Sequence, residues 1–430
     1  MQKNNILNNI DLAITHLTQQ LRTNPYDSDL YNNLASIHYK INNIDEAIYN
    51  YQRSLQLNPH NWQAHYNLAN CYTKKNFIPD AINHYKFSLE LHPDNINAIQ
   101  NLGMLLVSIE DFKNALPYLE QAYNKEKSNQ ANIEFINYLA NCYINTSNTT
   151  KAIQLLEDAS NLHTNNTEVK GSVHHNLAIL YLSNNEYIKA KQHFKISVTI
   201  NPNNQTAQHM LTALDQQTTD QAPPQYIADL FDQYASYYNK HLRETLQYKL
   251  PEKFRALYAK HNKTNTVQNT LDLGCGTGLC GIYFRDTTVN LIGVDLSKNM
   301  LLHAKSLEAY DLLIQANIQK NNIFQPNYFD VIIAADVVPY MGDLENFFSN
   351  ITNLLKQNCN FIFNIELINS NQNNLFELQQ TGRYSHSKNY IKLLVEKFNL
   401  TIIENLTETI RLQNNTPTIG VVFFISKLYL

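Results

Sequence analysis

Small and apolar residues recur at a fixed interval along the first half of the chain. Alanines are spaced 34 residues apart, at Ala13, Ala47, Ala81 and Ala115. Two further landmarks keep this interval, leucines followed by a small residue (Leu34, Leu68, Leu102) and prolines (Pro25, Pro59, Pro93). Small residues let two helices approach closely, and proline ends a helix. The pattern predicts helical hairpins that stack into an all-α solenoid, because one hairpin cannot bury its apolar face alone.

A 34-residue period with these landmarks is typical of tetratricopeptide (TPR) repeats. We predict a half-repeat at 6–24, a capping helix at 206–217 and, between them, five full repeats at 28–61, 62–95, 96–129, 133–166 and 171–204. The solenoid domain is therefore placed at 1–218. Pro223-Pro224 cannot continue a helix, so residues 219–225 are predicted as a linker and 226–430 as a second domain.

The second domain has one prominent motif. Residues 268–281 read QNTLDLGCGTGLCG, a strand-like segment that runs into a glycine-rich turn and a helix candidate. An apolar run then ends in Asp295. Glycines let the backbone approach a ligand, and an acid at the tip of the second strand can accept hydrogen bonds from a ribose diol. The motif predicts a cofactor site at this turn.

Two cofactors compete for the motif. Gly276-x-Gly278-x-x-Gly281 satisfies the dinucleotide fingerprint, so an NAD(P)-dependent oxidoreductase is one alternative. Asp272 precedes the first glycine by two residues, where an acid can hold the amino group of S-adenosylmethionine (SAM). The later segment FDVIIAADVVPYM, residues 329–341, is an apolar strand that ends in an acid. The position of Asp272 and the acid at the end of this later strand favour SAM over NAD(P) as the cofactor.

From about Tyr226 onward the chain resembles the class I SAM-dependent methyltransferases, through the wording LDLGCGTG, GVDLSKNML and FDVIIAADV. The whole chain is similar to predicted bacterial methyltransferases with N-terminal TPR repeats; YIADLFDQYASYYNKHL and GRYSHSKNY resemble segments of that subgroup. The resemblance implies an α/β Rossmann-like domain with a seven-stranded, mostly parallel sheet and an antiparallel last strand. Strands are expected near 268–273, 290–295, 311–316, 329–335, 359–366, 399–405 and 419–427.

The resemblance also implies the residues around the cofactor. Asp295 would hold the ribose hydroxyls, and Asn317 falls where many members carry an Asp that contacts the adenine amine. An Asn can still accept there through its carbonyl oxygen. The expected set is Asp272, Gly274, Cys275, Gly276, Gly278, Asp295, Met300, Asn317, Asp336 and Tyr234, with Phe231 and Tyr238 beside Tyr234 on a helix that resembles a lid.

Residues expected at the carboxyl ends of the later strands are candidates for the methyl-acceptor site. Proton transfer could involve His386, Tyr340 or Tyr384, and the ordinary pKa of histidine suits a base near neutrality. Arg383 could grip a substrate carboxylate or phosphate, and Glu366 is a second candidate for substrate binding. The acceptor itself, a small molecule or a protein, is not defined by these residues.

A series of asparagines is the candidate binding feature of the solenoid. Asn33, Asn67 and Asn101 recur every 34 residues on the first helix of each repeat, and Asn176 takes the matching place in the fifth. An amide can pair with both groups of a peptide unit, so a protein or peptide partner is predicted on the concave face. Asparagine is abundant throughout the chain, so composition also explains these positions, and Tyr138 interrupts the series.

Composition narrows the class of protein. Lys and Arg number 33 and Asp and Glu 37, for a net charge of −4, which argues against a nucleic-acid partner. No apolar run predicts a membrane span or a secretory signal, and five scattered cysteines fit a reducing, cytoplasmic setting without a metal site. The sequence favours an active methyltransferase whose TPR arm selects a partner or substrate. A TPR scaffold with a vestigial methyltransferase domain and the oxidoreductase remain alternatives.

Overall fold

The computed structural model divides into two compact units, Met1–Asn184 and Asn185–Leu430. No helix among the residues described is both long and apolar enough to cross a membrane. The structure describes residues 2–126, 133–161, 167–234, 242, 246–262, 266–319, 323–368, 374–413 and 416–428.

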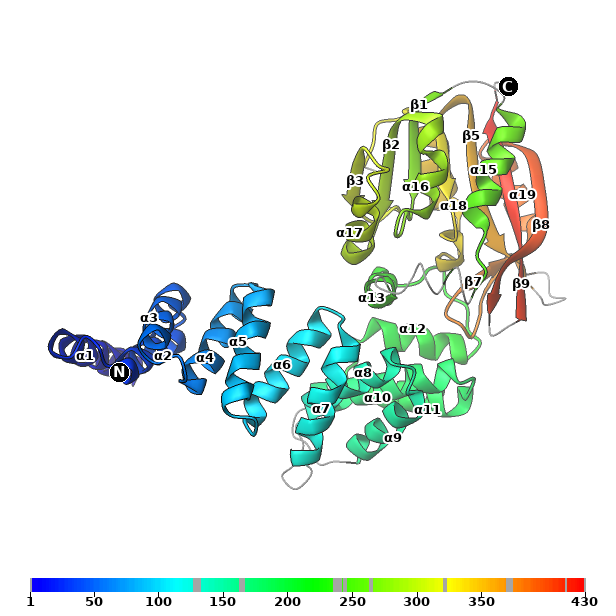
Figure 1. Ribbon diagram of the computed structural model, residues 1–430. Coiled ribbons are helices and arrows are strands. Elements are labelled where there is room, and N and C mark those ends of the chain that lie inside the picture. Colours follow the sequence, from blue (N-terminus) through cyan, green and yellow to red (C-terminus); the bar gives the residue numbers. More distant parts are fainter. Residues whose placement is uncertain are drawn as a thin grey trace. The chain divides into compact units, whose positions relative to one another are not determined.

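The first unit is a stack of helical hairpins, which follow one another in chain order (Figure 1). Its helices are α1 (Gln2–Thr23), α2 (Ser28–Lys40), α3 (Ile44–Leu57), α4 (Trp62–Lys74), α5 (Ile78–Leu91), α6 (Ile96–Ser108), α7 (Phe112–Glu126), α8 (Ile133–Asn145), α9 (Thr149–Ser160) and α10 (Thr167–Ser183). The helices from α2 to α9 fall within the expected repeats, whereas α10 begins four residues before the expected fifth repeat. The all-α architecture predicted for this part of the chain is confirmed.

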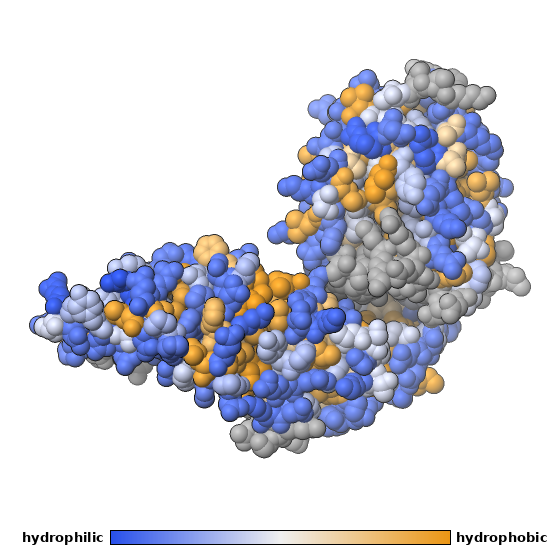
Figure 2. All heavy atoms as spheres, viewed as in Figure 1, coloured by the Kyte–Doolittle hydropathy of each residue, from blue (hydrophilic) through white to orange (hydrophobic). Residues whose placement is uncertain are grey.

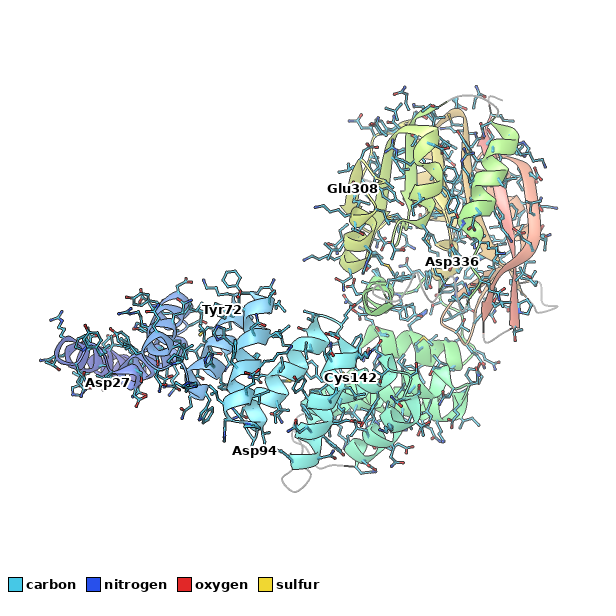
Figure 3. The ribbon with its side chains drawn as sticks, in the orientation of Figure 1. Asp27, Tyr72, Asp94, Cys142, Glu308 and Asp336 are labelled. Atoms are coloured by element: carbon cyan, nitrogen blue, oxygen red, sulfur yellow. The ribbon has the colours of Figure 1, made fainter. Side chains whose placement is uncertain are left out.

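Small residues and caps explain why the hairpins form where they do. A Cβ on Gly103 would lie 2.6 Å from Cδ2 of Leu119, so α6 and α7 meet in direct contact at this glycine. Asp27, labelled in Figure 3, accepts hydrogen bonds from backbone N–H groups at the start of α2. Asn61 and Asn95, each 34 residues further on, cap α4 and α6 in the same way. Side-chain caps of this kind satisfy N–H groups that the helix leaves without partners.

The turn inside each hairpin needs a left-handed residue. A positive φ recurs there, at Asn42, Asn76, Glu110, Ser147 and Asn185. Asparagine adopts this backbone region more readily than most residues other than glycine. Part of the asparagine content of the chain therefore has a structural cause.

The second unit begins with α11 (Tyr187–Ile200) and α12 (Gln205–Leu214) and contains a seven-stranded sheet in the order β3-β2-β1-β4-β5-β9-β8. Only β9 runs antiparallel to the other strands, which confirms the predicted fold class. The strands are β1 (Val267–Leu273), β2 (Thr288–Asp295), β3 (Leu312–Gln315), β4 (Phe329–Ala334), β5 (Leu355–Glu366), β8 (Thr401–Gln413) and β9 (Thr416–Lys427).

Helices cover both faces of the sheet. Ile333 and Ile362 pack with α15 (Leu250–His261) and α16 (Leu279–Phe284). Their strand neighbours Ile332 and Phe363 point the other way, towards α18 (Glu345–Leu354) and α19 (Lys388–Lys397). This alternation follows from the two-residue period of a strand and buries the sheet on both sides.

The unit also contains α13 (Pro224–Tyr234), α17 (Lys298–Ser306), the short 3-10 helices η2 (Arg285–Thr287) and η3 (Val338–Tyr340), and a hairpin of β6 (Phe376–Leu378) and β7 (Tyr384–His386). The sequence analysis did not predict this hairpin, because strands of three residues carry no readable alternation. The hairpin and η3 both contribute to the surroundings of the candidate site.

Candidate cofactor site

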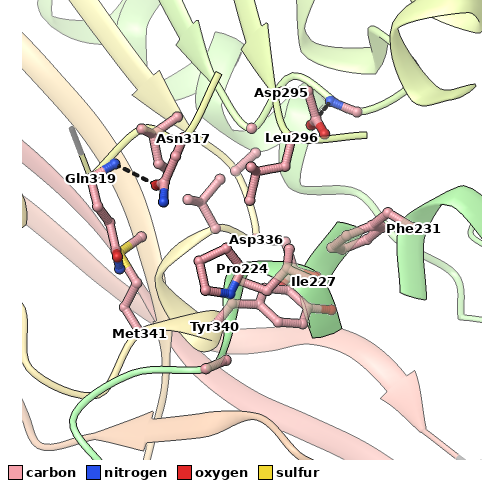
Figure 4. A pocket seen from close by; sticks show the side chains of 16 residues that line it. Pro224, Ile227, Phe231, Asp295, Leu296, Asn317, Gln319, Asp336, Tyr340 and Met341 are labelled. Carbon is pink, nitrogen blue, oxygen red and sulfur yellow. Dashed lines mark hydrogen bonds between the residues drawn. The ribbon is translucent and has the colours of Figure 1, made fainter. Parts of the chain in front are cut away.

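A pocket opens at the carboxyl ends of β1, β2 and β4 (Figure 4). It encloses about 700 Å³, counting its open mouth. Strand order reverses between β1 and β4, and ligands of open α/β sheets bind at such a point. Seven residues named from the sequence line the pocket: Phe231, Gly274, Gly276, Asp295, Asn317, Asp336 and Tyr340.

The glycine-rich turn forms the floor beside β1. Gly274, Gly276 and Gly278 have φ values of 61°, 53° and 89°, a region that residues with a Cβ rarely adopt. A Cβ on Gly274 would also lie 2.5 Å from Cγ2 of Val337, just after β4. The turn therefore requires glycine both for its backbone conformation and for its packing against the end of the neighbouring strand.

Asp295 ends β2 and faces the same turn. Its Oδ2 accepts the N–H of Gly276 and its Oδ1 accepts the N–H of Ser297, both at 2.8 Å. Burial raises the pKa of Asp295, and the backbone N–H groups act in the opposite direction. Each carboxylate oxygen has a further lone pair, so the group can still accept two hydroxyl hydrogens from a ligand.

Asp272 lies under the turn and outside the pocket lining. Its Oδ2 accepts a hydrogen bond from the hydroxyl of Tyr310 at 2.6 Å. Burial raises the pKa of Asp272 to about 7, and the Tyr310 bond moderates that rise. The same hydroxyl accepts the N–H of Gly281 at 3.1 Å, and a Cβ on Gly281 would overlap the Tyr310 ring.

Tyr310 therefore explains the last glycine of the fingerprint-like spacing. A Cβ on Gly278 or Gly293 would also lie 3.0 Å from this ring. The sequence analysis missed Tyr310, whose only signal is the small size of the glycines around it. Those glycines lie in three different elements or turns, so their common neighbour is visible only in the folded chain.

Several expected cofactor residues do not line the pocket. Met300 is fully buried in α17, where its N–H bonds the Oγ of the capping Ser297. Burial raises the pKa of the Cys275 thiol, so it is a neutral, small side chain in the turn. The side chain of Tyr234 and all of Tyr238 lie outside the described residues, whereas Phe231 on α13 does line the pocket.

Asn317 lies opposite Asp295 in the pocket, after β3 (Figure 4). Its carboxamide oxygen accepts the N–H of Gln319 at 2.9 Å. The carbonyl expected to meet an adenine amine is therefore partly engaged, and the amide nitrogen adds a donor. Gln319 itself also lines the pocket and was not predicted.

A buried charge cluster lies behind the pocket wall. Arg383 donates to Oδ1 of Asp336 at 2.6 Å and to Oε1 of Glu366 at 2.7 Å. Arg411 lies 2.7 Å from Oε1 of Glu366 and 3.4 Å from Asp336, so two cations offset two anions. Burial tends to raise the pKa of Asp336, but the two guanidinium groups outweigh burial and hold it below its usual value. Arg383 and Glu366 are thus paired with each other and do not line the pocket.

Of the three residues considered for proton transfer, only Tyr340 reaches the pocket. Its hydroxyl accepts a hydrogen bond from Arg383, whose guanidinium lies 4.6 Å from the ring centre. Burial raises the pKa of Tyr340 above its usual value, and the nearby guanidinium of Arg383 offsets part of this rise. The ring of Phe231 meets that of Tyr340 edge-on, 5.2 Å between centroids.

His386 and Tyr384 are buried elsewhere. The Nε2 of His386 lies 3.0 Å from the carbonyl oxygen of Gly342, and burial lowers the pKa of His386 to about 4. This pKa is below the neutral range expected from the sequence. The hydroxyl of Tyr384 bonds the Oγ1 of Thr219 at 2.6 Å, and burial raises the pKa of Tyr384 to about 12.

The segment predicted as a linker supplies one wall of the pocket. Ala222 and Pro224 line it, followed by Ile227 and Phe231 on α13. The N–H of Ala222 donates to the carbonyl of Tyr340 at 3.4 Å. Pro223-Pro224 correctly indicated that a helix could not continue through this segment. The sequence did not indicate that the segment would line a pocket.

Known protein families match both parts of the chain. A family described as a methyltransferase domain matches residues 271–361, which contain the glycine-rich turn, Asp295 and Asp336. Three TPR families match residues 28–61, 106–173 and 171–204. The chain carries a methyltransferase domain and tetratricopeptide repeats. The oxidoreductase alternative is not favoured, because the turn that suggested it lies within the methyltransferase match.

Individual relatives cover only parts of the chain. An 18S rRNA (guanine-N(7))-methyltransferase of Bos taurus is 29% identical over 122 residues, 26% of this chain and 43% of the relative. This chain therefore spans less than half of that relative. YrrB, a TPR protein described as having an unusual peptide-binding site, is 23% identical, with 45% and 96% of the two chains covered and a TM-score of 0.41. A SAM-dependent methyltransferase from Clostridium acetobutylicum is 19% identical, with 46% and 98% covered and a TM-score of 0.35.

Proposed function

We propose that residues 185–430 bind SAM and transfer its methyl group to an acceptor, and that the TPR solenoid binds a protein or peptide partner. One observation carries the cofactor assignment. The carboxylate of Asp295 is fixed by the N–H groups of Gly276 and Ser297 and lines the pocket beside the glycine-rich turn. A fixed acceptor at the end of the second strand suits the two hydroxyls of a ribose.

The residues of the pocket fit this cofactor by their chemistry. SAM supplies a methyl group that is activated by its bond to a sulfonium. Asp295 would hold the ribose, and Asn317 and Gln319 offer amide groups to the edge of an adenine. The glycine turn lets the backbone approach the ligand, and Tyr310 holds Asp272 in place beneath it. We retain Met300 and Cys275 as packing residues of this site.

Tyr340 is our candidate for orienting the acceptor. Its hydroxyl accepts from Arg383, so its own hydrogen can be donated to a group in the pocket. Asp336 is a poor proton acceptor, because two guanidinium groups hold its pKa low. The reaction then depends mainly on positioning, which can account for much of the rate of a displacement.

The first test is calorimetric titration of S-adenosylhomocysteine into the full chain, with NADH as the control ligand. Asp295→Ala should weaken binding by roughly 100-fold or more, because each hydrogen bond to a charged group contributes about 1.5–3 kcal/mol. Asp286→Ala is the matched control, since Asp286 is exposed and pairs with Arg255 at the surface. Binding of NADH in place of S-adenosylhomocysteine would contradict the proposal.

The second test is a search for the acceptor with isotope-labelled SAM. Protein, RNA and small-molecule fractions should all be offered, RNA because the bovine relative is named for an rRNA substrate. Transfer that is lost in Asp295→Ala identifies the acceptor class. Cofactor binding without transfer to any fraction would favour the scaffold alternative.

The solenoid offers amides that already bond across neighbouring repeats. The Nδ2 of Asn101 donates to Oδ1 of Asn70 at 2.9 Å, and Nδ2 of Asn176 donates to Oδ1 of Asn137 at 3.1 Å. Asn33 is exposed and Asn67 half-buried. The amides of Asn101 and Asn176 are therefore held in fixed orientations, which favours recognition of an extended peptide.

Apolar side chains support the same proposal. On the face shown in Figure 2 they gather over α5 and α6, in the middle of the first unit. Peptide arrays probed with the full chain should show fewer binders for the double substitution of Asn67 and Asn101 by Ala. Asn114→Ala is the control, because Asn114 is exposed and its side chain bonds Asp111 in the same repeat. Equal profiles for all three proteins would contradict peptide binding through these amides.

A further inference from the structure

The last helix of the solenoid sequence belongs to the methyltransferase unit. A helix that merely ends a solenoid presents a polar face to water. α12 instead buries His209 and Met210, of which His209 retains 4% of its surface. The Nε2 of His209 lies 3.0 Å from the carbonyl oxygen of Gly382, and its ring centre lies 4.5 Å from that of Tyr226.

Gly382 is the tight point of the β6–β7 turn. Its φ is +77°, its N–H bonds the carbonyl of Gln379 at 2.9 Å, and a Cβ there would lie 2.6 Å from the Tyr226 hydroxyl and 2.7 Å from Sδ of Met210. The turn therefore packs between α12 on one side and the start of α13 on the other. The turn and α12 are therefore in direct contact at this glycine.

The segment between α12 and α13, residues 215–223, forms a strap over the same region. Thr218 accepts the N–H of Leu378 at 3.2 Å, and Thr219 bonds the hydroxyl of Tyr384. The carbonyl oxygen of Asp220 accepts two N–H groups, from Gly342 at 2.9 Å and Asp343 at 2.7 Å. The strap thus bonds both the β6–β7 hairpin and the loop after η3.

Both routes end on the residues that form the pocket wall. From the hairpin, Arg383 donates to the Tyr340 hydroxyl and His386 bonds the carbonyl of Gly342. From the strap, Ala222 donates to the carbonyl of Tyr340. Tyr340 and Met341 line the pocket.

We propose that α12 and the strap belong to the methyltransferase and hold one wall of its pocket, residues Tyr340–Gly342, in place. His209 is a positioning residue for this wall. The catalytic module then begins near Asn185, before α11, and not at residue 226. That this wall contacts a cofactor and an acceptor rests on the proposed function. That His209 positions Gly342 rests only on the contacts between them and is independent of the proposed function.

The test uses the full chain with His209→Ala, His209→Gln and a matched control, His174→Ala, which removes a buried histidine of α10. Hydrogen exchange is measured at the amides of Gly342 and Asp343 and at those of β1. S-adenosylhomocysteine affinity is measured on the same samples. His209→Ala should speed amide exchange at Gly342 and Asp343 about tenfold. It should also weaken the affinity for S-adenosylhomocysteine about tenfold, the change expected for one hydrogen bond.

His209→Gln should restore most of both effects, since its amide can donate to the Gly382 carbonyl, and His174→Ala should change neither. Equal acceleration in β1 would show a general loss of stability and overturn the proposal. If His209→Ala does not fold, Thr219→Val keeps the test open, because this exposed position loses only its bond to Tyr384. It should speed exchange at Gly342 severalfold. If the unaltered chain binds no S-adenosylhomocysteine, the proposed function fails, and the exchange result still decides the role of His209.

Discussion

The two units differ in how far apart in sequence their bonded residues lie. In the helical unit, Ser36 bonds Tyr51 and Tyr85 bonds Asn70 across 15 residues. In the second unit, His209 bonds Gly382 across 173 residues. A solenoid is stabilised by contacts between adjacent repeats, whereas the sheet unit depends on segments from its whole length. Damage should therefore stay local in the first unit and spread in the second.

The units also differ in how they use charge. The Lys75–Asp45 pair of the solenoid is open to solvent, with 80% of the Asp45 side chain exposed. The Arg383–Asp336 pair is nearly buried, with 10% and 11% exposed. Exposed pairs contribute little to stability, but removal of one partner from a buried pair leaves a costly charge. The four predictions below test these two contrasts.

The largest effect is expected from Arg383→Met. The substitution leaves Asp336 and Glu366 buried with only Arg411 to offset them, and should lower the free energy of unfolding by about 3–5 kcal/mol. Lys75→Met, at the surface, should cost less than about 1 kcal/mol. Urea denaturation followed by circular dichroism measures both. An equal loss of unfolding free energy in both variants would show that the buried and exposed ion pairs do not differ as proposed.

Core truncations should separate the units next. Leu102→Ala in α6 and Ile332→Ala in β4 each remove a fully buried side chain and should cost about 2–5 kcal/mol. We expect Leu102→Ala to open the solenoid locally and leave S-adenosylhomocysteine binding unchanged. Ile332→Ala should reduce binding at temperatures where the second unit begins to unfold. Hydrogen exchange and calorimetry report the two effects, and a loss of binding in both variants would contradict local damage in the solenoid.

The buried His386 should make the second unit sensitive to acid. Its folded pKa of about 4 lies below the ordinary value, so between pH 7 and 4 the unfolded chain takes up a proton that the folded chain does not. This residue should therefore contribute about 2–3 kcal/mol of stability at pH 7 that is lost as the pH falls towards 4.

Comparison with His386→Gln isolates this effect, because Asp272 titrates in the opposite sense. Its raised pKa of about 7 means that the folded chain binds the proton first, which adds stability as the pH falls. The stability difference between the unaltered chain and His386→Gln should shrink from pH 7 to pH 4. A constant difference for His386→Gln would show that His386 does not titrate as proposed.

The smallest effect concerns the repeat turns. Asn76→Ala places a less tolerant residue at φ 61° and should cost about 1 kcal/mol, whereas Asn76→Gly should cost little or add stability. Thermal unfolding of the two variants measures the difference. A stable alanine variant would mean that the turn can change its conformation without affecting the hairpin.

The all-α repeat architecture could be predicted from the sequence because its causes are local. The caps Asp27, Asn61 and Asn95 and the left-handed Asn42 and Asn76 each act within a few residues of their own position. The same holds for the glycine-rich turn and for Asp295, which are adjacent in a strand-turn-helix-strand unit. Such features leave a period or a motif that can be read along the chain.

The supporting residues of the site were not readable in this way. Tyr310 holds Asp272 from 38 residues away, and Arg383 reaches Tyr340 across 43. His386 was a candidate for proton transfer and lies fully buried, because its strand pairs inside the unit. The strap was predicted as a linker because its partners, such as Tyr384 for Thr219 and Gly342 for Asp220, lie more than 100 residues away along the chain.

By itself, the sequence determined the repeat architecture and the cofactor-type turn, since each depends on spacing within a short stretch of chain. The sheet class was implied by the resemblance to a known family. Only the tertiary structure decided which buried groups pair, which candidate residues face the pocket, and that α12 belongs with the sheet. Those choices depend on burial and on contacts between distant segments, and a buried polar group takes its partner from whatever the fold brings within hydrogen-bond distance.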